Sequence, residues 1–190
     1  MGGEAARGRR RAIAAAALAC AGGLALSLHA APGREGWFGA GLLLLAAAIA
    51  VIDLRHLIIP NELNLAVAAL GLARAGLAAP DAPWAALGDA ALRGLIFGAA
   101  LLAVRQAYWL ARRRHGLGLG DVKLAAAGGV WLHWASQPIA VEIAALSALA
   151  VYVLQARARH APIDWTSRLP FGLFLAPAIW AAWLIEAWPG

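Results

Sequence analysis

The chain has 190 residues, of which 63% are hydrophobic and only 14% are charged, and its mean hydropathy is +0.71. An average soluble domain is nearer half apolar and a quarter charged, so this composition argues against a soluble protein and indicates an integral membrane protein. The net charge of +6 does not indicate nucleic-acid binding, because the basic residues are grouped between apolar runs.

Seven apolar runs follow one another along the chain, separated by turn-forming Pro, Gly, Asn and Asp. A transmembrane helix needs roughly 17–25 mostly apolar residues. The predicted spans are residues 12–31, 37–54, 62–79, 87–110, 122–135, 138–156 and 171–188. The fifth is short enough to be partly interfacial. The sequence therefore predicts an all-α polytopic membrane protein, a bundle of six to seven transmembrane helices.

The whole chain, residues 1–190, is expected to form one integral-membrane domain with its core at residues 37–188. Residues 1–36 would add a basic N-terminus and one further span. This first run has a second interpretation, because it also resembles a cleavable signal peptide, with Ala30 at a small-residue site or Cys20 at a lipoprotein-like site. We expect the span to be retained, since a retained span fits the alternation of charge described next.

The basic residues between the spans indicate the orientation, because cytoplasmic loops are enriched in Lys and Arg. If every run crosses the membrane, one side holds Arg7, Arg9, Arg10, Arg11, Arg55, His56, Arg112, Arg113, Arg114, Lys123, Arg157, Arg159 and Arg168. We therefore expect the N-terminus in the cytoplasm. Arg74 and Arg93 lie inside predicted spans near their outer ends, where long side chains can extend to the membrane boundary.

Two aspartates lie where apolar runs end. Asp53 follows the run 42–52, and Asp121 closes the glycine-rich stretch 116–121. Two complete spans separate them, so both lie on the same side of the membrane whichever way the chain is inserted. Acids at the edge of a bilayer are costly and are functional-site candidates by default. If the two carboxyl groups meet, they have the chemistry of an aspartic protease.

Each aspartate also has an ordinary structural interpretation. Asp121 could be the N-cap of a helix after a flexible loop, and Asp53 could be a boundary acid paired with Arg55 or Lys123. Two adjacent carboxylates share a proton. Since Asp53 lies near the C-terminal end of one predicted helix and Asp121 at the N-terminal end of another, the helix dipoles predict that Asp121 is ionised and Asp53 protonated.

Three segments resemble type IV prepilin peptidases. Asp53 is followed seven and eight residues later by Pro60 and Asn61, as in the first catalytic segment of that family. Residues 118–124 resemble the second, Gly-x-Gly-Asp-x-Lys-Leu, an element whose Gly-x-Gly-Asp part is shared with presenilin-like intramembrane proteases. Residues 169–176 are similar to a Pro-Phe-Gly-Pro segment near the C-terminus, with Leu173 in place of the last proline.

The resemblance implies a membrane-embedded aspartic endopeptidase that removes the basic leader of prepilins or pseudopilins at the cytoplasmic face of the bacterial inner membrane, typically after a glycine. It implies that Asp53 and Asp121 are catalytic. Supporting or substrate-binding residues would be Gly118, Gly120, Lys123, Pro60 and Asn61. Lys123 could instead contact lipid phosphates, and Asn61 could simply cap the third helix.

No metal and no organic cofactor is expected, because His56 and His115 lack a third ligand. The bifunctional family members carry paired Cys-x-x-Cys motifs and N-methylate the new terminus; this chain has one cysteine, so no methyltransferase activity is expected. The expected partners are a prepilin helix and the lipid bilayer. Two other functions stay open: a transporter or channel component that moves protons or cations past the aspartates, and a non-catalytic assembly protein of a pilus or secretion system.

Overall fold

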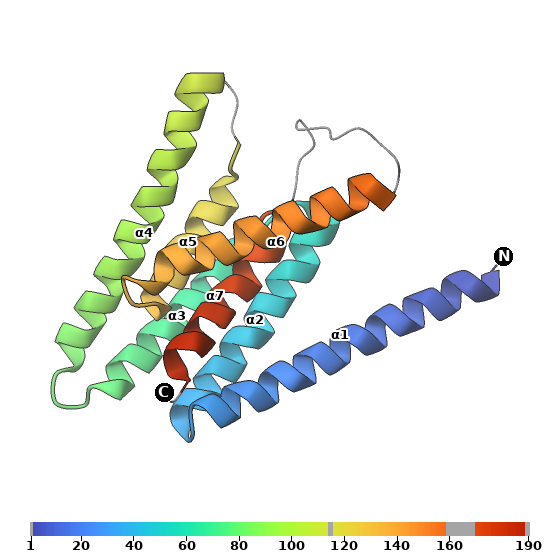
Figure 1. Cartoon of the computed structure of the whole chain (residues 1–190). Helices are drawn as coiled ribbons and strands as arrows, with labels where there is room; N and C mark the ends of the chain where they lie inside the picture. Colours follow the sequence, from blue (N-terminus) through green and yellow to red (C-terminus); the bar gives the residue numbers. More distant parts are fainter. Residues whose placement is uncertain (1, 114–115, 159–169, 189–190) are drawn as a thin grey trace.

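The computed structural model describes residues 2–113, 116–158 and 170–188. The regular structure of this part is entirely helical, which confirms the predicted all-α class (Figure 1). The helices are α1 (Gly2–Ala30), α2 (Arg34–His56), α3 (Asn61–Ala78), α4 (Pro83–Arg112), α5 (Leu119–Trp131), α6 (Ser136–Ala158) and α7 (Gly172–Ala187). Of the residues named above, Arg114, His115, Arg159, Arg168 and Leu169 lie outside the described part.

The helix boundaries agree with the predicted spans to within four residues, except at the start of α1. That helix begins at Gly2, so the arginine-rich segment before the first predicted span is helical as well. Two prolines lie in first turns, Pro83 in α4 and Pro138 in α6. They are tolerated there because the first N–H groups of a helix have no intrahelical partner.

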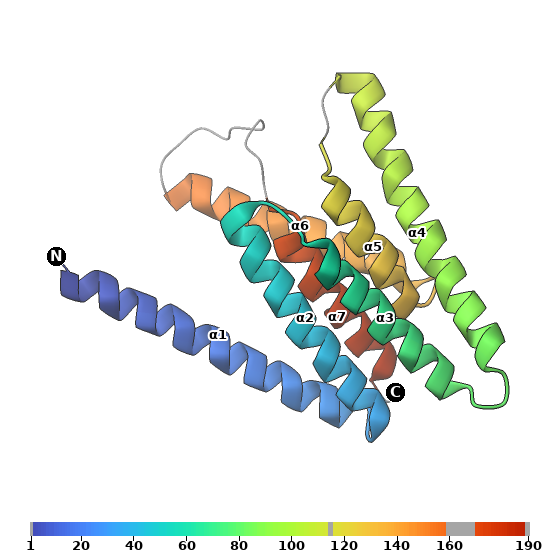
Figure 2. The ribbon, with the colours of Figure 1, turned by 180° about the vertical axis from the view of Figure 1, so that it is seen from behind.

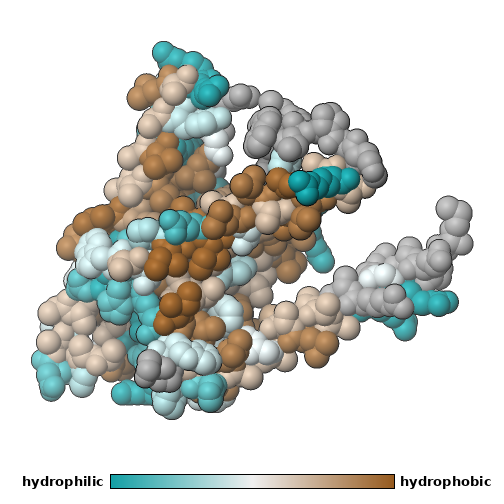
Figure 3. Space-filling model, in the orientation of Figure 1, coloured by the Kyte–Doolittle hydropathy of each residue, from teal (hydrophilic) through white to brown (hydrophobic). Residues whose placement is uncertain are grey.

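Three of the described helices, α2, α4 and α6, are long and apolar enough to cross a membrane. Residues Ala14–Ala30 and α7 form shorter apolar helices. Apolar side chains also cover much of α6 in Figure 3. Leu146 and Leu154 of this helix are exposed. The chain is therefore a multi-pass membrane protein.

The core lies between α2, α3, α5 and α7, with α4 packed beside α3 and α5 and with α6 crossing the bundle obliquely (Figures 1 and 2). Only the C-terminal part of α1 lies near the bundle. Trp131 of α5 is fully buried, donates from Nε1 to the carbonyl oxygen of Val67 at 2.9 Å, and packs edge to face against Trp183 of α7. The ring of Trp183 in turn lies over Gly39 of α2, where a Cβ would overlap it. These two tryptophans connect all four core helices.

Side chains from three other helices form hydrogen bonds with the C-terminal end of α5. With 13 residues, α5 is the shortest of the described helices. The last carbonyl groups of a helix have no intrahelical partner, and that end of the helix dipole favours positive charge. The donors are Arg93 to the oxygen of Val130 at 3.5 Å, Arg74 to that of Trp131 at 3.3 Å, and Gln137 to that of Leu132 at 3.4 Å. We call Arg74, Arg93 and Gln137 the α5 cap.

The two arginines of the α5 cap are also paired with acids. Arg74 forms an ion pair with Glu35 at 2.6 Å, and Arg93 forms one with Asp89. Arg93 is only 8% exposed, and its guanidinium group contacts both Asp89 and the carbonyl end of α5.

Candidate active site

Asp53 and Asp121 lie at the same end of the bundle, where α2 ends and α3, α5 and α7 begin (Figure 1). Both are buried, with 4% and 8% of their surface exposed. Neither Arg55 nor Lys123 forms an ion pair with Asp53 in the part of the chain that the structure describes. Asp53 is thus not neutralised as a simple boundary acid.

The carboxylate of Asp53 receives hydrogen bonds from the beginning of α7. The backbone N–H of Leu173 donates to Oδ2 at 3.0 Å, and the N–H of Gly172 contributes a second bond. A helix N-terminus favours negative charge, because its N–H groups are free and its dipole is positive there. The start of α7 therefore partly offsets the unfavourable dipole at the end of α2, so Asp53 lies between two helix ends of opposite effect.

Asp121 is the third residue of α5 rather than its N-cap, which is Gly118. Its Oδ2 accepts a hydrogen bond from the N–H of Gly118 at 3.1 Å. This is the reciprocal half of a capping box, in which an acid in the first turn reaches back to the capping residue. The bond fixes the carboxylate against its own helix and favours its charged form.

Ile59, in the connection between α2 and α3, packs against the starts of α5 and α7. A Cβ added to Gly120 would lie 3.3 Å from the Cβ of Ile59, and one added to Gly172 would lie 2.6 Å from its Cδ1. The Gly172 position is also 2.9 Å from Oδ2 of Asp53. The two glycines thus allow the starts of α5 and α7 to close around one side chain, and the three segments singled out in the sequence meet here.

Asn61 and Lys123 are joined directly. Nζ of Lys123 donates to Oδ1 of Asn61 at 2.8 Å, on the exposed side of the site. The N-cap residue of α3 is Pro60, and no side chain caps that helix, so the interpretation of Asn61 as its cap is wrong. The bond instead ties the start of α3 to the start of α5, beside the two aspartates.

One buried polar residue of α3 was not singled out in the sequence. Asn64 of α3 is 6% exposed, and neither Nδ2 nor Oδ1 has a hydrogen-bond partner among the described residues. A polar residue in the first turn of a helix is common, so the sequence held no signal for its burial. No group of three or more His, Cys, Asp or Glu placed to hold a metal ion occurs in the described part of the chain.

Comparison with known proteins identifies one family. Residues 40–154 match the model of the type IV leader peptidase family. The chain is 34% identical over 153 residues to a prepilin leader peptidase/N-methyltransferase of Pectobacterium carotovorum subsp. carotovorum, an alignment that covers 80% of this chain and 53% of the relative. It is 33% identical over 154 residues to the protein of that name from Pseudomonas aeruginosa, covering 78% and 50%.

A third relative is matched over most of its length. The leader peptidase HopD of Escherichia coli is 35% identical over 143 residues, which cover 72% of this chain and 87% of HopD. The chain thus spans about half the length of the first two relatives, at 53% and 50%, and most of the third. No solved structure matches the chain significantly.

Proposed function

Since the chain belongs to the type IV leader peptidase family, we propose that it is a membrane-embedded aspartic endopeptidase that removes the basic leader of a prepilin or pseudopilin. Asp53 and Asp121 are its two catalytic carboxylates in this proposal. The observation that carries it is the burial of both groups at one end of the bundle, where the starts of α5 and α7 close around Ile59. We place the site at the cytoplasmic face of the bacterial inner membrane, where the basic residues gather.

The chemistry needs one ionised and one protonated carboxyl group. The ionised aspartate takes a proton from a water molecule between the pair, and the protonated aspartate donates a hydrogen bond to the scissile carbonyl oxygen. The N–H of Leu173 holds Asp53, and the N–H of Gly118 holds Asp121, so that neither carboxylate needs to reorganise when the water attacks. Methyl transfer is not part of this proposal.

A processing assay tests the proposed function. The chain is expressed with a prepilin in bacteria that lack their own prepilin peptidase, and the N-terminus of the product is determined by mass spectrometry. We expect a product that begins directly after the glycine of the leader. Prepilin that stays unprocessed beside the folded wild-type chain would contradict the peptidase and leave the transporter or assembly functions.

The protonation of the pair can be read from pH–rate profiles. Asp121 bonds to the start of its own helix and Asp53 to the start of α7, but Asp53 also lies at the unfavourable end of α2. We therefore predict that Asp53→Glu chiefly moves the alkaline limb of the profile of kcat/KM, since it alters the proton-bearing group, and that Asp121→Glu chiefly moves the acid limb. If the two variants changed both limbs of the profile equally, this would contradict the assignment of the proton to Asp53 and of the charge to Asp121.

Gly172→Ala is expected to impair cleavage without unfolding the chain. The added methyl group would lie 2.9 Å from Oδ2 of Asp53 and 2.6 Å from Cδ1 of Ile59, so both groups must shift. A displacement of about 1 Å at reacting groups can lower the rate by roughly 100-fold. The measurement is kcat with a purified prepilin, together with the melting temperature in detergent.

Gly88→Ala is the matched control for this variant. It lies in α4, and an added Cβ would meet nothing within 4 Å. The same methyl group should therefore leave cleavage unchanged and stabilise the helix by roughly 0.5–1 kcal/mol. A Gly172→Ala chain as active as the Gly88→Ala chain would show that the contact between α7 and Asp53 is not needed for catalysis.

A further inference from the structure

Asn64 is a polar side chain buried inside the bundle without a described partner. It is 6% exposed, and both polar atoms of its carboxamide lack hydrogen bonds within the part of the chain that the structure describes. Burying an amide without a partner is unfavourable, and native proteins keep such groups rarely and for a reason. A ligand that supplies the missing partners is one such reason.

Contacts on both sides of Asn64 along α3 determine which neighbour it faces. Three residues earlier, Asn61 accepts a hydrogen bond from Lys123 of α5, and three residues later the carbonyl oxygen of Val67 accepts one from Trp131 of α5. Residues three or four apart lie on the same side of a helix. Asn64 therefore lies on the side of α3 that packs against α5, beside its first half.

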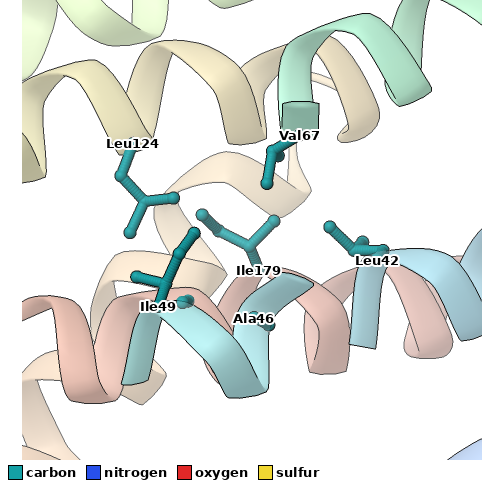
Figure 4. A pocket seen from close by; sticks show the side chains of 7 residues that line it. Leu42, Ala46, Ile49, Val67, Leu124 and Ile179 are labelled. Atoms are coloured by element: carbon teal, nitrogen blue, oxygen red, sulfur yellow. The ribbon is translucent and has the colours of Figure 1, made fainter. Parts of the chain in front are cut away.

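An apolar pocket fixes the depth of Asn64 relative to the aspartates. Figure 4 shows side chains from α2, α3, α5 and α7 that point toward one another around an apolar pocket with no room for a water molecule. They are Leu42, Ala46, Ile49, Val67, Leu124, Ala176 and Ile179.

Three of these lining residues are each one helical turn from a polar residue of the site. Ile49 precedes Asp53 by four positions, while Leu124 and Val67 follow Asp121 and Asn64 by three. Since α2 runs toward this end of the bundle and α3 and α5 run away from it, all three polar residues lie one turn from the pocket on the same side (Figure 1). They share one layer of the bundle.

We propose that Asn64 is a substrate-binding residue whose carboxamide forms hydrogen bonds with a peptide group of the prepilin next to the bond that is cut. This inference rests on the proposed function. A carboxamide offers one acceptor and N–H donors, the complement of the C=O and N–H of a peptide group. A substrate chain that is extended for cleavage has unpaired backbone groups, which need partners at membrane depth. The adjacent pocket is lined by apolar side chains and supplies none.

The test uses Asn64→Leu, which keeps the number and branching of the heavy atoms and removes both polar atoms. Replacing an unpaired buried amide by an apolar group should leave the melting temperature unchanged or raise it. Binding should weaken about tenfold, as expected for the loss of one to two hydrogen bonds to the substrate. The probe is a synthetic prepilin with a basic leader, a glycine and an apolar helix. Its Kd is measured by fluorescence anisotropy in the Asp121→Asn background, and its KM in the active chain. Asn64→Ser, which retains one hydroxyl group, should fall between wild type and Asn64→Leu.

Gln137→Leu is the control, because Gln137 is an equally buried carboxamide, 4% exposed, at the other end of the bundle and bonded to Leu132. It should lower the melting temperature and leave Kd unchanged. The inference is overturned if the wild-type chain cleaves the probe and both the Kd and the KM of Asn64→Leu stay within twofold of the wild-type values. If the Asn64→Leu substitution lowers the melting temperature, the Kd and the KM of Asn64→Ser are compared with the wild-type values by the same twofold limit. A wild-type chain that neither binds nor cleaves the probe would overturn the proposed function as well.

Discussion

Asp53→Asn and Asp121→Asn are each expected to lower the rate of leader cleavage by about 10³-fold or more, while the chain stays folded. The amide keeps the size of the side chain but can neither accept a proton from water nor share one with its neighbour, and general acid–base catalysis alone contributes about 10²–10⁴-fold. Both side chains are buried beside backbone N–H donors that an amide oxygen can still use, so the fold should tolerate the change. The measurement is the initial rate of cleavage of a purified prepilin.

The double variant should be no slower than either single variant, because residues that act as one unit have non-additive effects. Glu62→Gln is the control: this exposed acid lies in the first turn of α3, at the same end of the bundle, and its neutralisation should change the rate less than threefold. Cleavage that persists in either asparagine variant at more than about a tenth of the wild-type rate would contradict the catalytic pair.

Trp131→Ala is expected to give the largest loss of stability, about 3–5 kcal/mol, the range for removing a fully buried large aromatic side chain. Trp131 has 0% exposure, bonds to the backbone of α3 through Val67, and packs against Trp183. Its removal leaves a cavity where α3, α5 and α7 meet and leaves the carbonyl group of Val67 without that donor. The free energy of unfolding is measured by reversible denaturation in mixed micelles.

Trp84→Ala is the matched control, because Trp84 is 83% exposed at the start of α4. The same substitution there should change the free energy of unfolding by no more than about 0.5 kcal/mol. A Trp131→Ala chain that is as stable as the Trp84→Ala chain would show that the tryptophan contacts do not hold the core helices together. Catalytic activity should fall with stability, since α5 carries Asp121.

The helices could be predicted because membrane spans leave a strong signal in the sequence. Apolar runs bounded by Pro and Gly located both ends of six helices to within four residues. The start of α1 at Gly2 was missed because hydropathy locates only the apolar part of a helix, whereas Arg is also a good helix former. The first ten residues of this continuous helix were therefore not predicted, because they do not belong to the apolar run.

The site could be predicted in part. A carboxylate at the end of an apolar run is conspicuous, so the sequence singled out Asp53 and Asp121, which the structure buries at one end of the bundle. The donors that hold Asp53 could not be found, because they are backbone groups of α7, 120 residues away along the chain. Leu173 replaces the last proline of the family pattern, and only a residue other than proline has the N–H for this bond.

One contact of Arg93 could not be predicted for a related reason. Near the end of an apolar run, an arginine normally extends to the membrane surface. In the structure its guanidinium group pairs with Asp89 and also donates to the carbonyl oxygen of Val130, which becomes available because α5 ends at Trp131. The length of one helix therefore provides an acceptor for a side chain on another, and no local pattern in α4 contains that information.

The α5 cap has a consequence for the apolar interior of the protein. At 1.5 Å per residue, the 13 residues of α5 span about 20 Å, whereas the hydrocarbon core of a typical bilayer is about 30 Å thick. Nine of these residues are buried, so α5 faces the neighbouring helices rather than lipid. Charged side chains at one end of α5 and the aspartates at the other therefore enclose an apolar layer that is thinner than the surrounding bilayer. At least one polar end of α5 then lies within the hydrocarbon thickness, where charged side chains need partners from the protein.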